Sequence, residues 1–185
     1  MDPLSDEAAT VQFRNGYLPA GAVLYSRHKD AIYSFCLRML RDPDAAQDAS
    51  QETFLKMMTK VQSLKDGVAV KSWLFSVARN EVLMVLRRKK IVPMDKFEED
   101  GPAVDTMNPL TMALDGELND VLQKAILTLK PAYREAYLLR EVEGLTYEEI
   151  ALATESTVSA VKSKLFKSRA ALVELLTPYM ERRKL

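Results

Sequence analysis

One stretch in the middle of the chain, residues 91–110, constrains the fold more than any other. It reads IVPMDKFEEDGPAVDTMNPL and contains three prolines, a glycine and an excess of negative charge. Proline removes a backbone donor and breaks helices, so a packed element is not expected here. A chain of 185 residues can bury two small cores. We therefore predict two compact domains, 18–90 and 114–185, joined by a flexible acidic linker over 91–113 and preceded by an N-terminal tail over 1–17.

Helix-forming residues dominate on both sides of this linker. Leu, Ala, Glu, Lys and Met are plentiful, whereas the chain has only six Gly and eight Pro. Long alternating runs of β-branched residues, typical of strands, are missing from the sequence. The predicted fold class is all-α: two small helical domains joined by the flexible linker. Helices are expected near 18–41, 43–61, 71–90, 118–129, 131–144, 146–153 and 158–176.

The helix expected after Asp42 has two faces of different character. Asp42 is a good N-cap, and Pro43 suits the first helical position. One face is apolar, with Phe54, Met57, Met58 and Val61, and the other is polar, with Asp44, Gln47, Asp48, Gln51 and Glu52. The polar stripe is either a binding surface or an ordinary solvated face. A metal site is disfavoured because no histidine completes a coordination sphere there.

The last third of the chain carries the most informative pattern. Thr146 and Glu149 form a capping box that starts a short helix, and a polar break at 154–157 ends it. The long helix that follows has an apolar stripe at helical spacing, made of Val158, Val161, Leu165 and Leu172. A short helix, a tight break and a long helix are typical of a helix-turn-helix.

The face opposite that stripe suits a reader of the DNA major groove. Helical geometry places Ser159, Lys162, Ser163, Phe166 and Lys167 there. Lysine neutralises phosphate or donates to guanine, serine bonds base edges, and an exposed phenylalanine can touch a thymine methyl. The alternative is a merely solvated face, since helix-turn-helix geometry also occurs in proteins that do not bind DNA.

The formal net charge is zero, but its distribution favours nucleic acid. The first basic block contains Lys71, Arg79, Arg87, Arg88, Lys89 and Lys90. The second contains Lys162, Lys164, Lys167, Arg169, Arg182, Arg183 and Lys184. Acidic residues of the linker and the start of the second domain separate the two blocks.

Several other classes of function are excluded or disfavoured. An apolar run of the ~20 residues needed to span a membrane is missing, and the first residues lack the pattern of a secretory signal, so we expect a cytoplasmic protein with no membrane insertion. The single Cys36 excludes an intrachain disulfide. No catalytic constellation surrounds the single histidine, His28, which we expect at the surface. We expect neither an enzyme nor a cofactor.

Two segments carry a resemblance to a known family. The segment LLREVEGLTYEEIALATESTVSAVKSKLFKSRAAL resembles region four of the extracytoplasmic-function (ECF) sigma factors. Region two of the same family is similar to DPDAAQDASQETFLKM followed by KSWLFSVARNEV. Both motifs occur in the family's order and together cover most of residues 20–180. The resemblance implies an RNA polymerase sigma factor that directs promoter-specific transcription initiation and assists promoter melting.

The resemblance also implies which residues make the contacts. Region two of the family binds the clamp helices of core RNA polymerase, which implies contacts by Asp48, Gln51, Glu52 and Phe54. It also melts the minus-ten element and captures a flipped base in the loop before its last helix, here 63–70. The residues implied there are Lys56, Lys65, Arg79 and Asn80.

Region four of the family reads the minus-thirty-five element with the second helix of the helix-turn-helix. Lys162, Ser163, Phe166 and Lys167 occupy the matching positions. The sequence departs from the family at Glu155, where a glycine is usual in the break, and at Ser159-Ala160, where Gly-Thr is usual near the start of the reading helix. We expect a somewhat different turn and an altered promoter preference as a result.

The implied partners are core RNA polymerase, promoter DNA and an anti-sigma factor that masks the binding surfaces. The main alternative is a conventional helix-turn-helix transcriptional regulator. Such a protein would bind duplex DNA unaided, whereas a sigma factor typically requires core polymerase for tight promoter binding.

Overall fold

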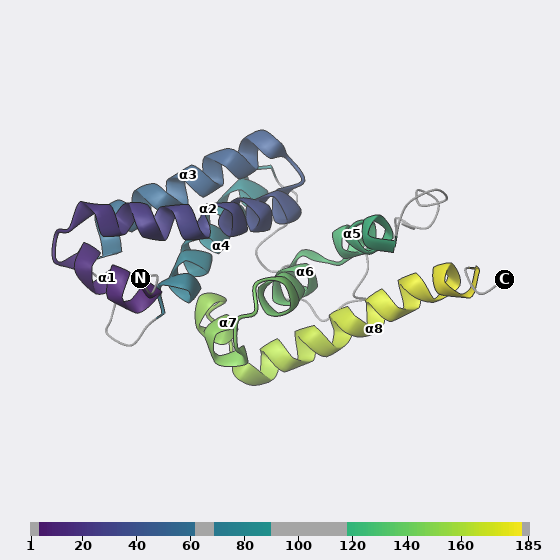
Figure 1. Cartoon of the computed structure of the whole chain (residues 1–185). Coiled ribbons are helices and arrows are strands. Elements are labelled where there is room, and N and C mark those ends of the chain that lie inside the picture. Colours follow the sequence, from purple (N-terminus) through teal and green to yellow (C-terminus); the bar gives the residue numbers. More distant parts are fainter. Residues whose placement is uncertain (1–3, 62–68, 90–117, 183–185) are drawn as a thin grey trace. The chain divides into compact units, whose positions relative to one another are not determined.

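The computed structural model of the chain describes residues 4–61, 69–89 and 118–182. Its elements are α1 (Asp6–Arg14), α2 (Leu18–Leu40), α3 (Pro43–Lys60), α4 (Val70–Arg88), α5 (Leu118–Thr128), α6 (Pro131–Tyr137), the π-helix η4 (Leu138–Val142), α7 (Tyr147–Ala153) and α8 (Val158–Arg182) (Figure 1). The described part of the chain contains no β-strand, which confirms the all-α prediction. The predicted linker over 91–113 and Lys65 lie outside the described residues.

The helices belong to two compact units. The first contains α1 to α4, and the second contains α5, α6, η4 and α8. Helix α7 is divided, because residues 151–156 are assigned to the first unit. Two small helical domains are therefore confirmed, whereas the boundaries drawn from the sequence stay predictions.

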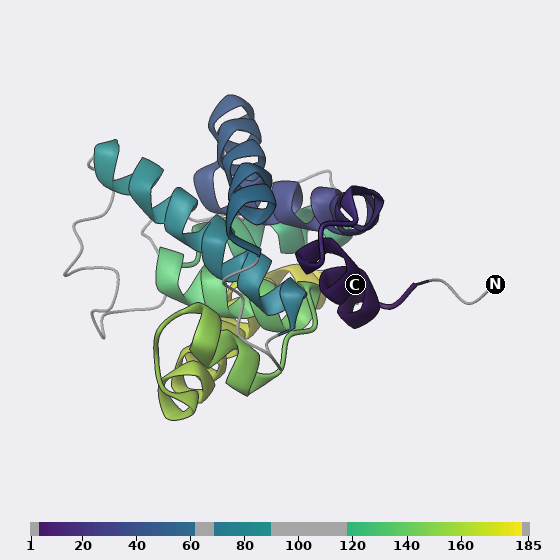
Figure 2. The ribbon, with the colours of Figure 1, turned by 90° about the vertical axis from the view of Figure 1, so that its left-hand side faces the viewer.

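In the first unit α2, α3 and α4 pack against one another (Figures 1 and 2). The rings of Phe35 and Phe75 meet edge to face at its centre, with centroids 5.5 Å apart and planes at 86°. Other fully buried side chains include Leu24, Ile32, Met57 and Leu74. Burying a large apolar side chain contributes about 1.5–3 kcal/mol, so this cluster is the main source of stability for the three helices.

The start of α3 is tied to the end of α4 through Asp42. Its Oδ1 accepts a hydrogen bond from the backbone amide of Ala45 at 3.1 Å, which confirms the predicted N-cap. Its Oδ2 lies 2.5 Å from Nζ of Lys89, one of the basic residues that end α4. Hydrogen bonds from Lys89 and the Ala45 amide hold the pKa of the Asp42 carboxyl below its usual range.

Helix α1 lies within the residues that the sequence had assigned to a tail. Its N-cap is Ser5, whose hydroxyl accepts from the amide of Ala8 at 3.2 Å. Phe13 is buried on Gly21 of α2, where an added Cβ would come within 2.7 Å of the phenyl ring. A nine-residue helix is marginal alone, so this docking on α2 explains why it forms.

The prediction that His28 lies at the surface is wrong. Its side chain is 7% exposed, and its Nε2 lies 2.8 Å from Oδ2 of Asp6 in α1. Arg27 also forms an ion pair with Asp6 and donates to the Leu4 carbonyl at 2.7 Å. Burial raises the pKa of Asp6, but hydrogen bonds and attraction from Arg27 and His28 outweigh it and lower that pKa overall. The prediction failed because residues 1–17 were assigned to a tail, whereas α1 forms there and covers the histidine.

The second unit is built around α8, which packs on α6 and α5. The side chains buried there include Ile126, Leu129, Leu138, Leu139, Val161 and Leu165. Gly144 has a φ of +72° and follows η4, which confirms it as the predicted helix stop. Helix α8 continues past the predicted end at Leu176, through Pro178, to Arg182.

A buried arginine caps the C-terminal end of α5. Arg134 of α6 is 5% exposed, and its guanidinium donates to three carbonyls. Nε lies 3.3 Å from the Ile126 oxygen, and Nη2 lies 2.6 Å and 2.8 Å from those of Leu127 and Leu129. Because the last carbonyls of a helix lack partners within it, this side chain satisfies groups that α5 itself cannot.

The start of α7 has the predicted capping box. The amide of Glu149 donates to the Thr146 hydroxyl at 3.1 Å, and the amide of Thr146 donates to the Glu149 carboxylate at 2.7 Å. Thr157 caps α8 in turn, accepting from the Ala160 amide at 3.1 Å. The capping box fixes the start of α7, and Thr157 fixes the start of α8 directly after the break, so the helix-turn-helix prediction is confirmed in its local structure.

Glu155 adopts the left-handed backbone conformation within this break, with φ at +53°. That conformation favours glycine, because a Cβ crowds the following carbonyl oxygen. Glu155 therefore carries local strain in this break. The expected difference of the turn from that of the family stays a prediction.

We expect Glu155→Gly to raise the free energy of unfolding by about 1 kcal/mol. Left-handed backbone costs a non-glycine residue about 1–2 kcal/mol, and the greater flexibility of unfolded glycine offsets part of the gain. Urea unfolding followed by far-ultraviolet circular dichroism measures the change. Glu155→Ala keeps the strain and should give no gain, and a glycine variant no more stable than the alanine variant would contradict the prediction.

Candidate functional site

Helix α8 presents three of its four predicted DNA-reading residues to solvent. Lys162 and Ser163 are exposed, and Phe166 is 74% exposed. Val161 and Leu165 between them are buried in the second unit. Lys167 is half-buried at the edge of the face and has an interaction of its own. The face derived from periodicity is thus the exposed face of the helix.

An aromatic and charged cluster that was not predicted from the sequence lies beside that face. Tyr147, the first residue of α7, has Cζ of Arg140 4.8 Å from its ring centroid and Nζ of Lys162 5.8 Å from it. Arg169 of α8 forms an ion pair with Glu141 of η4. That pairing raises the pKa of the Arg169 guanidinium, burial opposes it, and Tyr147 adds to the rise. Three elements meet in this cluster, so no single periodic pattern pointed to it.

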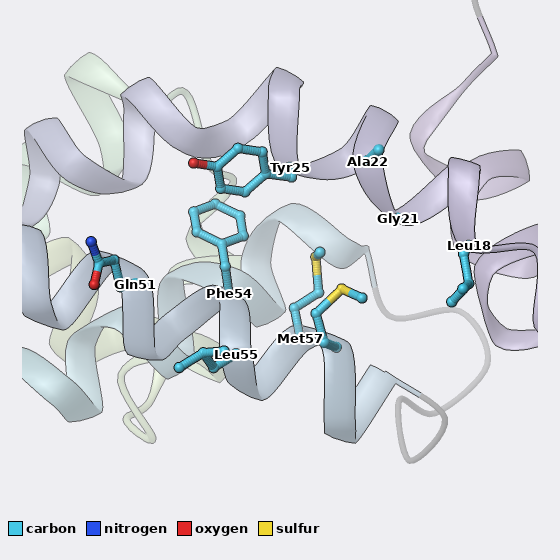
Figure 3. Close-up of a pocket in the computed structure, with 9 residues that line it drawn as sticks. Leu18, Gly21, Ala22, Tyr25, Gln51, Phe54, Leu55 and Met57 are labelled. Carbon is cyan, nitrogen blue, oxygen red and sulfur yellow. The ribbon is translucent and has the colours of Figure 1, made fainter.

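The polar stripe of α3 borders an apolar pocket. Asp48 and Gln51 are exposed and Glu52 is half-buried. The pocket has a volume of about 500 Å³. Its walls come from α2 and α3 and comprise Leu18, Gly21, Ala22, Tyr25, Gln51, Phe54, Leu55, Met57 and Met58 (Figure 3). The polar stripe therefore adjoins an open apolar surface.

Phe54 belongs to the wall of this pocket and is only 6% exposed. Its ring meets Tyr25 edge to face, with centroids 4.8 Å apart (Figure 3). The apolar side chains that protrude most from α3 are Leu55, at 60% exposed, and Met58, at 50%. Met58 belongs to the predicted apolar face, and it lies at the exposed edge of that face, in the lining of the pocket.

The predicted minus-ten residues that the structure describes differ in their exposure. Asn80 is exposed, but Arg79 is 8% exposed and has an interaction of its own. Lys56 forms an ion pair with Glu81, whose side chain is 4% exposed. The cation of Lys56 thus compensates a buried carboxylate and links α3 to α4.

Cys36 is fully buried near this pair, and its pKa is raised to about 12 by burial and by the charge of Glu81. A thiol held in this protonated state is a poor nucleophile. Among residues 4–61, 69–89 and 118–182, no group of three or more His, Cys, Asp or Glu side chains could hold a metal ion. Within the same residues, no helix is both long and apolar enough to cross a bilayer.

Comparison with known proteins identifies the family. Residues 24–91 match the family described as Sigma-70 region 2, and residues 119–172 match the one described as Sigma-70, region 4. The chain belongs to the sigma-70 family. The two matches coincide with the two helical units in the order that the motifs predicted. They do not favour a conventional helix-turn-helix regulator.

The relatives of this sigma factor are of the ECF type. The chain is 30% identical over 181 residues to the ECF RNA polymerase sigma factor SigE of Mycolicibacterium smegmatis, covering 96% of its own length and 66% of that relative. It is 28% identical over 190 residues to the ECF RNA polymerase sigma-E factor of Salmonella typhimurium, covering 98% and 99%. These matches place it among the ECF RNA polymerase sigma factors.

A solved structure shares the fold. The sigma factor RpoE of Bartonella quintana, crystallised in complex with the anti-sigma factor NepR, is 27% identical with a TM-score of 0.66. The match covers 84% of this chain and 96% of that one.

Proposed function

We propose that this sigma factor attaches to core RNA polymerase through the α3 surface and reads the minus-thirty-five element with α8. The observation that carries the proposal is the exposed face of α8. On this face a phenylalanine that is 74% exposed stands beside an exposed lysine and an exposed serine, so that apolar, cationic and hydroxyl groups are presented together. These are side chains that contact phosphates, base edges and thymine methyls.

The α3 surface supports the polymerase contact. Two exposed polar side chains, Asp48 and Gln51, adjoin the apolar pocket, and Leu55 and Met58 protrude beside it. Apolar surface rimmed by polar groups is typical of a protein interface. Phe54 would act from the wall of the pocket, by shaping it, with Asp48, Gln51 and Glu52 at the rim.

Asn80 is the best placed of the minus-ten candidates. Its amide is exposed on α4, and it can bond the edge of an unpaired base. The phosphate contacts of Arg79 and Lys56 remain predictions, because Arg79 is largely buried and Lys56 is paired with Glu81. Lys65 remains a prediction as well.

We also propose an anti-sigma factor as the regulator of this chain, as the complex of the Bartonella quintana relative suggests. Its target would be the same two surfaces, on α3 and α8. The expected action is non-enzymatic and cofactor-free, because binding within the holoenzyme provides the free energy for opening the duplex. A cytoplasmic location follows from this role.

Transcription in vitro with purified chain and bacterial core polymerase on a genomic promoter library tests the proposal. We expect transcripts from a narrow set of promoters. Lys162→Ala/Lys167→Ala should weaken promoter binding and reduce the slope of log affinity against log salt by up to about two, one for each lost phosphate contact. Asp48→Ala/Glu52→Ala should weaken binding to core polymerase instead.

Charge-matched variants control for non-specific electrostatics. Lys29→Ala/Lys130→Ala removes one cation of α2 and one directly before α6, and Glu7→Ala/Asp30→Ala removes one exposed carboxylate of α1 and one of α2. Both controls should behave like the unaltered chain. The proposal fails if the chain never engages core polymerase, or if each control loses as much activity as its test variant.

A further inference from the structure

The Tyr147 ring connects the reading helix to the rest of its domain. Its ring centroid lies 4.8 Å from Cζ of Arg140 and 5.8 Å from Nζ of Lys162. Arg140 is itself fixed, because its Nη1 donates to the Leu145 carbonyl at 2.7 Å. A chain of contacts thus runs from the backbone through Arg140 and Tyr147 to the ammonium group of Lys162.

This arrangement restricts a side chain that would otherwise be mobile. Lysine carries its charge on a flexible four-carbon stem, and ordering that stem on binding costs conformational entropy. A cation within about 6 Å of an aromatic centroid is attracted to the negative face of the ring. The attraction orders the Lys162 stem before DNA arrives, so that less entropy is lost on binding.

The neighbouring cation on α8, Arg169, is held chiefly by Glu141, and its weaker interaction is with the Tyr147 side chain. Nε of Arg169 donates to Oε1 of Glu141 at 3.0 Å, and its Nη2 pairs with the same oxygen. The π-helical turn η4 supplies both Arg140 and Glu141, so one irregular segment supports the Tyr147 ring and holds Arg169. On the α8 reading face, Lys162 has its ammonium group over the face of the Tyr147 ring.

We infer that Tyr147 is a positioning residue, which holds Lys162 in the orientation that contacts the minus-thirty-five element. This inference rests on the proposed reading role of Lys162. It assigns Tyr147 an effect on DNA through Lys162 and not through a contact of its own.

A double-mutant cycle on the holoenzyme tests this inference. The variants are Tyr147→Leu, Tyr147→Gln, Tyr147→Phe and Lys162→Ala, together with Tyr147→Leu/Lys162→Ala. Binding is measured on a labelled promoter duplex recovered from the transcription experiment. The base preference of each holoenzyme is measured by selection from duplexes randomised in the minus-thirty-five element. Circular dichroism during urea unfolding reports the stability of each variant.

Tyr147→Leu and Tyr147→Gln should each weaken promoter binding about two- to fivefold, the range expected for an exposed cation–π contact. Tyr147→Phe keeps the ring and should bind like the unaltered chain. In the Lys162→Ala background, Tyr147→Leu should cause no further loss. Base preference should weaken only at the base pair where Lys162→Ala also weakens it, which a general loss of stability would not produce.

Two results separate failure of the inference from failure of the proposed function. If Lys162→Ala weakens binding but Tyr147→Leu adds its full loss to that variant, Tyr147 acts independently and the inference is wrong. A Tyr147→Phe variant as weak as Tyr147→Leu would also overturn it, since the hydroxyl would then matter instead of the ring. If Lys162→Ala changes neither affinity nor base preference, the reading role of Lys162 is itself wrong.

Discussion

Arg134→Met should unfold most of the second domain while leaving the first folded. The substitution removes the donors that satisfy the carbonyls of Ile126, Leu127 and Leu129 at the end of α5. The Ile126 carbonyl keeps the Leu129 amide as a donor, whereas those of Leu127 and Leu129 lose the Arg134 side chain. A buried polar group left without a partner costs about 1–3 kcal/mol, so these two losses together should cost about 2–6 kcal/mol. Small domains have little more stability than that in total.

Two spectroscopic signals distinguish the domains in this experiment. Trp73 is the single tryptophan of the chain and lies in α4, so its fluorescence reports the first domain. Circular dichroism reports the helices of both. Arg134→Met should lower the helical signal before urea is added, while the midpoint of Trp73 fluorescence stays unchanged.

Two further variants test the cause of this loss. Arg134→Lys keeps the charge but not the planar fork of donors, so the stability of its second domain should lie between those of the unaltered chain and Arg134→Met. Arg169→Met removes an arginine whose side chain is 50% exposed and should cost less than about 1 kcal/mol. If Arg134→Met were as stable as Arg169→Met, the three hydrogen bonds would not support α5.

The parts of the fold that the sequence predicted are those governed by local chemistry. The N-cap at Asp42, the capping box of Thr146 and Glu149 and the stop at Gly144 each depend on residues within a few positions of one another. The α8 face followed from the helical period alone. Such features need no knowledge of which helices become neighbours.

The parts that the sequence missed depend on contacts between distant elements. Burial of His28 requires the docking of α1, which is too short to be stable alone and carries only nine residues. Phe54 is buried because Tyr25 of α2 lies against it, whereas Met58, one turn further along α3, is half-exposed. Periodicity gives the direction of a face but not the position of its edges.

The candidate site shows the same division. Lys162 and Phe166 were predicted from the helical spacing of residues along α8. The role of Tyr147 depends on its contacts with Arg140 and Lys162, which belong to other elements. The pairing of Lys56 with Glu81 joins residues 25 positions apart and has no sequence signature. The family resemblance implied a DNA contact for Lys56. The structure gives its charge a second role, which is to pair with the buried carboxylate of Glu81.

Lys56→Met should therefore destabilise the first domain by about 2–3 kcal/mol. The methionine fills much of the lysine stem but leaves the carboxylate of Glu81 buried without its cation. Removing one partner of a fully buried ion pair costs about 3–5 kcal/mol, and the value is lower here because 31% of the Lys56 side chain is exposed. The midpoint of urea unfolding followed by Trp73 fluorescence should fall.

A second substitution separates the structural role of Lys56 from its predicted contact with promoter DNA. Glu81→Gln in the Lys56→Met background removes the uncompensated charge and should restore most of the stability. If transcription recovers together with stability, Lys56 acts within the fold. If stability recovers but promoter opening stays impaired, Lys56 also contacts the melted strand. A Lys56→Met variant as stable as the unaltered chain would show that Glu81 does not need the lysine, and the ion pair would then contribute nothing to folding.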